Sequence, residues 1–127
     1  MTPMILASTS AARKSLLAQA GLTFASLAAP VGERALEAPL IAAGEPSESI
    51  ALALARAKAE AVLALRPGSV VIGADQVLDL GGRRLVKSGD RAGARRQIGE
   101  LQGRTHRLVS AVVVAEGTGC VWQHVAD

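Results

Sequence analysis

Hydrophobic residues in the first part of the chain follow two spacings, one typical of strands and one typical of helices. Residues 3–7 form a short apolar run, and residues 11–20 carry an apolar stripe at helical spacing that ends at Gly21. Residues 22–29 are again mainly apolar. This order predicts a strand, a turn, a helix and a second strand.

The middle of the chain combines an irregular stretch with the strongest helix signal. Residues 30–45 are expected to form a loop, because Pro39 and Gly44 interrupt any regular pattern. Ser47 can cap a long helix that ends at 67–68, where Pro and Gly follow each other. The apolar stripe of that helix is expected to be its buried face: Ile50, Leu54, Ala57, Ala61 and Leu65.

The second half of the chain is expected to consist mainly of strands. Residues 70–72 are a β-branched run that a sheet would bury on both faces, and the run ends at Asp75. A hairpin of 76–80 and 84–87, a helix over 90–101 and strands over 108–115 and 120–125 are expected to follow.

The alternation of these elements predicts an α/β fold with a mixed central β-sheet flanked by helices. Residues 1–127 are about one domain's worth of chain, so a single domain is expected. The chain ends directly after a predicted strand, without a closing helix. We therefore expect a domain that lacks its C-terminal part.

Composition narrows the class of protein. Half of the residues are apolar, almost all of them Ala, Val, Leu and Ile, and Phe24 and Trp122 are the only aromatic residues. Such small side chains suit helices packed closely on a sheet. No apolar run approaches the roughly 18 residues of a membrane span, and no signal peptide is recognised. Cys120 is the single cysteine, which excludes an internal disulfide and favours a reducing compartment, the cytoplasm.

Positive charge is concentrated in one segment. The net charge is +3, and eight of the fourteen Lys and Arg residues lie within 83–107, where Asp90 and Glu100 are the only acids. The segment could bind nucleic acid or the phosphates of a small ligand, or it could be a solvated surface. Nucleic acid is the weaker interpretation, because the segment has no aromatic side chains on which bases could stack.

Ser8, Ser10 and Arg13 lie where the first predicted strand passes into the first helix. Backbone N–H groups at a helix N-terminus are unpaired, and the helix dipole favours an anion there. Two hydroxyl groups and a guanidinium group at this place could bind phosphate. Equally, Ser10 could simply cap the helix while Arg13 faces solvent.

Asp75 is expected at the carboxyl end of a central strand, where open α/β sheets bind their ligands. Together with Glu33, it could hold a divalent cation such as Mg²⁺ or Mn²⁺. Lys58 and Lys87 could neutralise a polyphosphate. The alternative is that Asp75 is a turn residue and that the other three are surface charges.

Six short motifs along the chain resemble those of the Maf family of nucleoside triphosphate pyrophosphatases. They lie in the order and spacing of that family: Ile5 to Ser10 with Arg13, Glu33, Ala55 to Ala59, Ile72 to Val77, Lys87, and Leu101 to His106. The resemblance implies a mixed-sheet α/β fold in a cytoplasmic, usually dimeric enzyme. It also implies hydrolysis of a nucleoside triphosphate to the monophosphate and pyrophosphate with a divalent metal such as Mg²⁺ or Mn²⁺.

The resemblance assigns roles to individual residues as well. It implies that the phosphate loop consists of Ser8, Ser10 and Arg13. It also implies that Glu33 and Asp75 are an acidic pair that binds the metal, and that Lys58 and Lys87 clamp the polyphosphate. Asp75 matches the proposed general base. Gln76 is expected to contact the substrate. The pair Asp75-Gln76 is similar to the branch of the family that removes 7-methyl-GTP, whereas the branch acting on thymidine and uridine triphosphates has Thr in place of Gln76.

The chain also departs from the family pattern. Gly32 replaces an acid, Ala12 replaces both a basic residue and the aromatic residue of the 7-methyl-GTP branch, and Ser88 replaces a proline. These changes weaken the expected metal and phosphate binding. A non-catalytic nucleotide-binding protein therefore stays open as an alternative, and a nucleic-acid-binding module that uses 83–107 is a weaker one.

Overall fold

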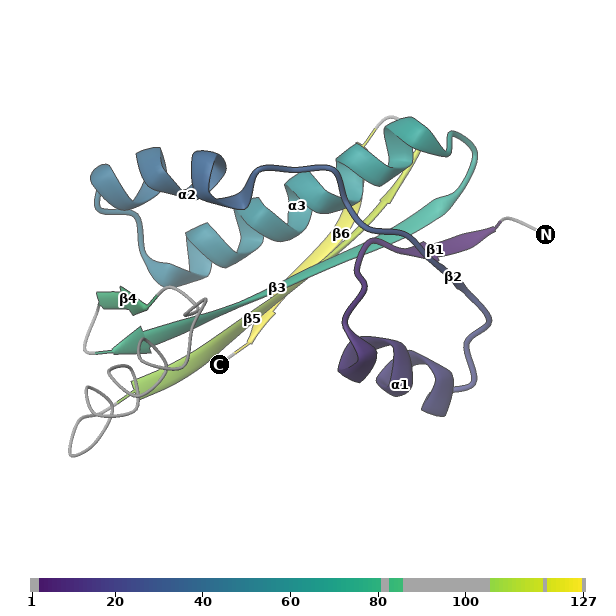
Figure 1. The fold of residues 1–127 in the computed structure, drawn as a ribbon, viewed down its shortest axis with the longest axis horizontal. Helices are drawn as coiled ribbons and strands as arrows, with labels where there is room; N and C mark the ends of the chain where they lie inside the picture. Colours follow the sequence, from purple (N-terminus) through teal and green to yellow (C-terminus); the bar gives the residue numbers. More distant parts are fainter. Residues whose placement is uncertain (1–2, 81–82, 86–105, 118, 127) are drawn as a thin grey trace.

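The structure is a computed structural model that describes residues 3–80, 83–85, 106–117 and 119–126. Figure 1 shows the fold. The elements, in chain order, are β1 (Met4–Leu6), α1 (Ala11–Gln19), β2 (Ala25–Ser26), α2 (Glu33–Ala42), α3 (Ser47–Leu65), β3 (Val70–Leu80), β4 (Arg83–Leu85), β5 (His106–Glu116) and β6 (Gly119–Ala126).

The strands form one mixed sheet in the order β2-β1-β3-β5-β6, and β4 pairs with the far end of β3. β1 runs parallel to both β2 and β3, whereas β3, β5 and β6 form an antiparallel meander. The expected α/β fold with a mixed sheet and flanking helices is therefore confirmed. No helix in the described part of the chain is long and apolar enough to cross a membrane.

The helices lie on opposite faces of the sheet. The chain moves from β1 to β2 through α1, and then back across the sheet to β3 through α2 and α3. Right-handed crossovers in opposite directions place their helices on opposite faces. Figure 1 accordingly shows α2 and α3 together on one side of the strands and α1 on the other.

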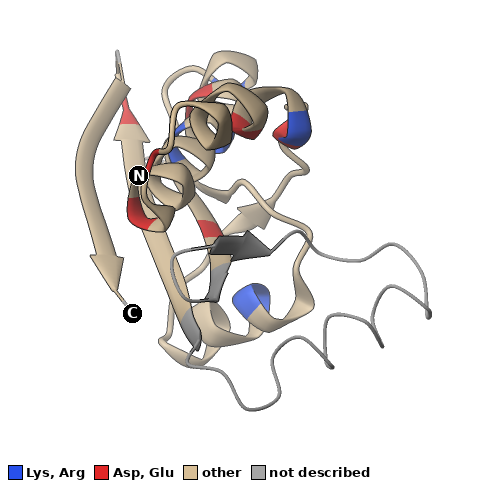
Figure 2. Cartoon of the chain, turned by 90° about the vertical axis from the view of Figure 1, so that its left-hand side faces the viewer, with Lys and Arg blue, Asp and Glu red and all other residues tan. Residues whose placement is uncertain are grey.

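The core lies between α3 and the sheet strands β3 and β5. α3 buries apolar side chains along most of its length, and they meet Val71 and Val77 of β3 and the inward residues of β5. Among the residues that Figure 2 colours, most of the charged ones lie on helices. In contrast, α1 has no buried residue, and its Leu16 is 66% exposed.

The buried face of α3 is rotated from the predicted stripe. Ile50 and Leu54 are buried as expected, but Leu65 is 49% exposed and Ala57 and Ala61 are only partly buried. The buried positions are instead Ala51, Ala55, Ala59, Val62 and Leu63. The inward face includes Ala51, Ala55 and Ala59, whose small side chains allow the helix backbone to approach the sheet closely.

Three element predictions differ from the structure. The loop expected over 30–45 contains α2, with Pro39 inside it; a proline removes one backbone donor, and the other bonds of a mostly exposed helix survive. The strand expected over 22–29 shrinks to β2, a two-residue edge strand. The predicted break at Asp75 is also wrong, because β3 continues to Leu80 while it pairs with β5.

Other predicted elements are only partly covered. The strands expected over 108–115 and 120–125 correspond to β5 and β6, and β4 covers the start of the second hairpin strand. The helix expected over 90–101 and most of the basic segment 83–107 lie outside the described residues.

Candidate functional site

The segment that follows β1 forms a compact polar turn at the N-terminus of α1. The Ser10 side chain accepts a hydrogen bond from the Arg13 backbone N–H at 3.3 Å and so caps the helix. The Ser8 Oγ accepts from the Ser10 backbone N–H at 3.1 Å and from Arg13 Nη1 at 3.3 Å. Ser26 of β2 also donates to the Ser8 carbonyl oxygen at 3.2 Å. Hydrogen bonds thus connect the turn to both α1 and β2, and a guanidinium group lies beside its hydroxyl groups.

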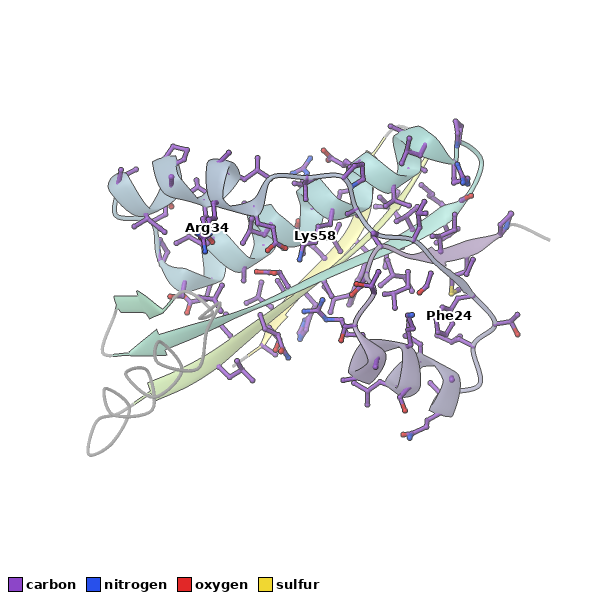
Figure 3. The ribbon with its side chains drawn as sticks, viewed as in Figure 1. Phe24, Arg34 and Lys58 are labelled. Carbon is purple, nitrogen blue, oxygen red and sulfur yellow. The ribbon has the colours of Figure 1, made fainter. Side chains whose placement is uncertain are left out.

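A second polar cluster centres on the Lys58 ammonium group. Lys58 Nζ contacts Asp75 Oδ1 at 3.0 Å and also forms an ion pair with Glu33 Oε1. The side chains of Lys58 and Asp75 are only 12% and 11% exposed, whereas that of Glu33 is 49% exposed. In Figure 3, Lys58 extends from α3 on the side where α2 begins. The cluster therefore joins α2, α3 and β3.

A close approach between α3 and β3 brings Lys58 and Asp75 together. A Cβ atom on Gly73 would collide with the Ala55 carbonyl oxygen and would lie 2.9 Å from the Ala59 Cβ. Only glycine permits this contact. Asp75 lies two residues beyond Gly73 and therefore on the same face of β3, and Lys58 directly precedes Ala59 on the helix. The packing contact thus fixes the ion pair next to it.

Asp75 lies just past the end of β1 in the sheet. β1 ends at Leu6, which is paired with Ile72, and the Ala7 backbone N–H donates to the Ile72 carbonyl oxygen at 2.9 Å. The Ser8 turn and Asp75 therefore both lie where the parallel part of the sheet stops. This is the edge at which α/β sheets bind ligands. Asp75 reaches it from within a strand rather than from a strand end.

The environment of Asp75 acts in two directions on its carboxyl group. Burial raises the pKa above the ordinary value of 3.8, and the neighbouring Glu33 adds to this effect. The charge and hydrogen bond of Lys58 and the charge of Arg13 lower the pKa, without reversing the shift. The Asp75 Oδ2 atom is buried and has no hydrogen-bond partner among the described residues. One oxygen of a buried carboxylate is therefore left to receive a proton or a ligand.

A cavity of about 480 Å³ opens between the two polar clusters. Ser8 and Thr9 line one side, and Gly32, Glu33 and Arg34 from the start of α2 line the other, with Lys58 between them. The remaining wall is formed by small aliphatic side chains: Ala7, Ala28, Ala29, Val31 and Ala35. The cavity thus has a charged part beside an apolar part, as sites for phosphorylated organic ligands do.

Six of the predicted site residues lie in the two polar clusters: Ser8, Ser10 and Arg13 in the turn, and Glu33, Lys58 and Asp75 around the ammonium group. Of these, Ser8, Glu33 and Lys58 line the cavity. Gln76 does not join them, because it projects from the other face of β3, where its Nε2 donates to Ser110 Oγ at 3.2 Å. Its predicted contact with substrate stays a prediction. Lys87 lies outside the described residues.

Sequence reasoning missed the contribution of α2 and of the chain before it. Arg34 and the wall of Ala28, Ala29 and Val31 were not candidates, because Ala28 and Ala29 were expected in a strand and Val31 and Arg34 in a loop. The helical spacing of apolar residues after Glu33, despite Pro39, is the signal that could have indicated the helix.

The geometry agrees with a comparison of the whole chain. A family model described as "Maf-like protein" matches residues 3–127. The chain belongs to the Maf-like family. The match covers the Ser8 turn, the acidic residues and the paired strands of this Maf-like chain, so the expected family membership is confirmed.

Curated Maf-like relatives are similar to the chain over almost all of its length. A protein of Brucella abortus named "7-methyl-GTP pyrophosphatase" is 46% identical over 97% of this chain and 62% of its own length. A protein of the same name from Mesorhizobium japonicum is 48% identical over 96% of this chain and 61% of its own. The "Nucleoside triphosphate pyrophosphatase" of Caulobacter vibrioides is 46% identical over 98% of this chain and 62% of its own length. The chain thus spans about three-fifths of the length of these relatives.

Proposed function

We propose that the chain carries the phosphate-binding and catalytic residues of a nucleoside triphosphate pyrophosphatase. The observation that carries the proposal is the Glu33–Lys58–Asp75 cluster, which lies at one cavity with the Ser8–Arg13 turn. The names of the Maf-like relatives support the same activity. The reaction would release the nucleoside monophosphate and pyrophosphate.

The triphosphate would bind between the start of α1 and Lys58. Arg13 and Lys58 supply positive charge, and Ser8 and Thr9 supply hydroxyl groups. Both α1 and α2 begin near this place, and α2 has no side-chain hydrogen bond at its N-cap, Gly32. Helix N-termini favour anions, so these groups act in the same direction.

Glu33 and Asp75 fit a divalent cation such as Mg²⁺ or Mn²⁺. They contact the same ammonium group, and Asp75 Oδ2 is a buried oxygen without a hydrogen-bond partner in the described chain. No group of three His, Cys, Asp or Glu side chains is placed to hold a metal among the described residues. Two carboxylates are nevertheless enough for Mg²⁺ when substrate phosphates complete the coordination. When bound, the cation would neutralise charge on the polyphosphate.

Asp75 is the group that would accept a proton in the reaction. Water would attack the α-phosphorus, Asp75 would take the proton, and the bond to the leaving pyrophosphate would break. A carboxyl group whose pKa is raised by burial is a better proton acceptor than an exposed one. Lys58, in contact with Asp75, and Lys87 would stabilise negative charge on the pyrophosphate.

The substrate is proposed to be a modified nucleotide such as 7-methyl-GTP. The names of several relatives support this choice. The small side chains of Ala28, Ala29 and Val31 leave room beside the charged part of the cavity. The predicted reading of the base by Gln76 would require the substrate to extend to the other face of β3.

The setting of the protein is part of the proposal. A single cysteine and no helix in the described residues able to cross a membrane support the cytoplasm. An uncharged edge strand, β6, supports a homodimer, because such edges favour pairing. Nucleic acid is not proposed as a partner, since the basic segment 83–107 lacks aromatic side chains.

Pyrophosphate release from a panel of nucleotides, with Mg²⁺ or Mn²⁺, tests the activity directly. Release from 7-methyl-GTP in preference to ordinary nucleotides is the expected result. Nucleotide binding without release would favour the non-catalytic alternative. Strongly salt-dependent retention on DNA or RNA would favour nucleic-acid binding.

A further inference from the structure

Lys58 holds two carboxylates at once from a largely buried position. Its ammonium group contacts Asp75 Oδ1 at 3.0 Å and pairs with Glu33, and its side chain is 12% exposed. A residue that served only to bind polyphosphate would be expected to point its charge into the cavity. Here the charge is directed at the two groups that would hold a cation.

We propose that Lys58 is an exchangeable counter-ion, which holds Glu33 and Asp75 in place and leaves them when a divalent cation binds. The released ammonium group then becomes available to the polyphosphate. This inference rests on the proposed function, because it concerns the same two carboxylates. It adds that cation binding and phosphate binding are linked through one side chain.

Charge explains why the two cations exclude each other. Two carboxylates and one ammonium group give the cluster a net charge of −1, whereas the carboxylates alone carry −2. A dication close to the ammonium group would be repelled strongly in a partly buried site. Asp75 Oδ2 is buried and has no hydrogen-bond partner among the described residues, but Oδ1 and Glu33 Oε1 are both in contact with Lys58. Full use of both carboxylates therefore requires Lys58 to move.

The packing of α3 against the sheet fixes the helix, whereas the Lys58 side chain can change its rotamer. Ala55 and Ala59 are fully buried against the sheet, where Gly73 admits the helix backbone. The lysine stem is long and flexible, and the cavity that Lys58 lines gives its ammonium group a place to go. Exchange therefore needs a rotamer change and no movement of α3.

The test is Mn²⁺ binding without nucleotide, measured by electron paramagnetic resonance at mildly alkaline pH. If Lys58 competes with the cation, Lys58→Met should bind Mn²⁺ more tightly than the wild type, by roughly tenfold. Arg56→Met is the matched control: it removes one positive charge from the same helix, but Arg56 pairs with Glu60 and not with the cluster. Its affinity should stay unchanged. Equal or weaker binding by Lys58→Met would overturn the inference.

Folding is controlled by a second variant and a second measurement. Lys58→Gln keeps a hydrogen-bond donor near Asp75 and should also bind Mn²⁺ more tightly than the wild type. In both variants Mn²⁺ should raise Tm more than in the wild type, because the ion replaces the missing counter-ion. If Mn²⁺ raises the Tm of Lys58→Met and Lys58→Gln no more than that of Arg56→Met, the inference is wrong.

The two proposals fail in different ways. Wild-type Mn²⁺ binding that Asp75→Asn abolishes, but that Lys58→Met does not strengthen, would overturn the exchange and leave the metal site in place. Binding of Mn²⁺ by none of these proteins would overturn the exchange together with the metal site. Pyrophosphate release by the wild type is measured separately and decides the proposed activity alone.

Discussion

Asp75 combines a buried position with a nearby positive charge, and the balance of the two sets its chemistry. Burial is the larger influence on its pKa and raises it, while Lys58 and Arg13 oppose the rise. A carboxyl group held in this way costs stability when it ionises. The same group becomes useful when a proton or a cation must be accepted. The position of Asp75 therefore supports its proposed chemical role and not a stabilising one.

The stability of the protein should carry the signature of this raised pKa. The contribution of protonated Asp75 is fully present below the unfolded value near 3.8 and is lost as the pH rises through the higher folded pKa. Relative to Asp75→Asn, the wild type should therefore lose stability across that window and then level off. Urea unfolding of both proteins over a pH series measures the difference. If the wild type instead becomes more stable relative to Asp75→Asn as the pH rises, the pKa of Asp75 is not raised.

The substitution Asp75→Asn tests the proposed role of Asp75 as the general base. Asp75→Asn keeps the shape of the side chain but can neither accept a proton nor hold a cation well. Loss of a general base typically lowers the rate by about 10²–10⁴. We expect this loss of pyrophosphate release with a cooperative thermal transition retained. Near-normal turnover by the folded variant would exclude Asp75 as the base.

Gly73 shows how one element contact sets the site. The inward face of β3 places Gly73 against the backbone of α3, and Asp75 comes two residues later on that face. A side chain at Gly73 must push the helix away, since its neighbours include a backbone carbonyl group. Lys58 would move with the helix, and its contact with Asp75 would lengthen.

Gly73→Ala should therefore cost both stability and activity. Overpacking of this kind typically destabilises by about 1–3 kcal/mol. Gly119→Ala is the matched control, because a Cβ atom there meets nothing within 4 Å. Chemical unfolding and pyrophosphate release of the two variants give the comparison. Equal behaviour of the two variants would show that the close approach does not position Lys58.

The elements also show what the pattern of residues could and could not predict. α3 was predicted close to its observed bounds, because a long apolar periodicity and the following Pro67 mark it. Its predicted cap was wrong, because the N-cap is Pro46 and Ser47 is already the first helical residue. α2 was missed, because Pro39 was given more weight than the helical spacing around it. The extent of β3 depends on its pairing with β5, whose residues lie 26 to 44 positions further along the chain than their partners. Such long-range pairing leaves no local signal.

At the scale of the whole molecule, most candidate site residues could be named from the sequence, but not all of their contacts. The motifs grouped Ser8 with Arg13 and Glu33 with Asp75, and they did not predict that Lys58 contacts both acids. That Lys58 bridges Glu33 and Asp75 follows from the packing of three elements. The same packing turns Gln76 away, because strand side chains alternate between faces. Candidate residues were thus predictable from the sequence, whereas the contact of Lys58 with both acids depends on the fold.

A preformed site predicts that ligand binding stabilises the entire sheet. Trp122, the only tryptophan, lies on β6, which is separated from β1 by β3 and β5. It therefore reports unfolding of the sheet without touching the candidate cavity. A triphosphate at 100 times its Kd should stabilise the fold by about 2.7 kcal/mol. The corresponding nucleoside, at the same concentration, should stabilise it much less, because in the proposed complex the charged groups at the cavity contact the phosphates.

The control for this prediction is Arg13→Ala, which should reduce the gain from the triphosphate and leave that from the nucleoside unchanged. Arg13 donates to Ser8 within the turn, and its charge reaches Asp75, so in the proposed complex it would contact the phosphates rather than the base. Trp122 fluorescence during thermal unfolding, with Mg²⁺ present throughout, measures all four combinations of protein and ligand. Equal gains from nucleoside and triphosphate would mean that the cavity does not recognise phosphate. A gain restricted to the triphosphate and diminished by Arg13→Ala would tie phosphate recognition at α1 to the stability of the distant sheet edge.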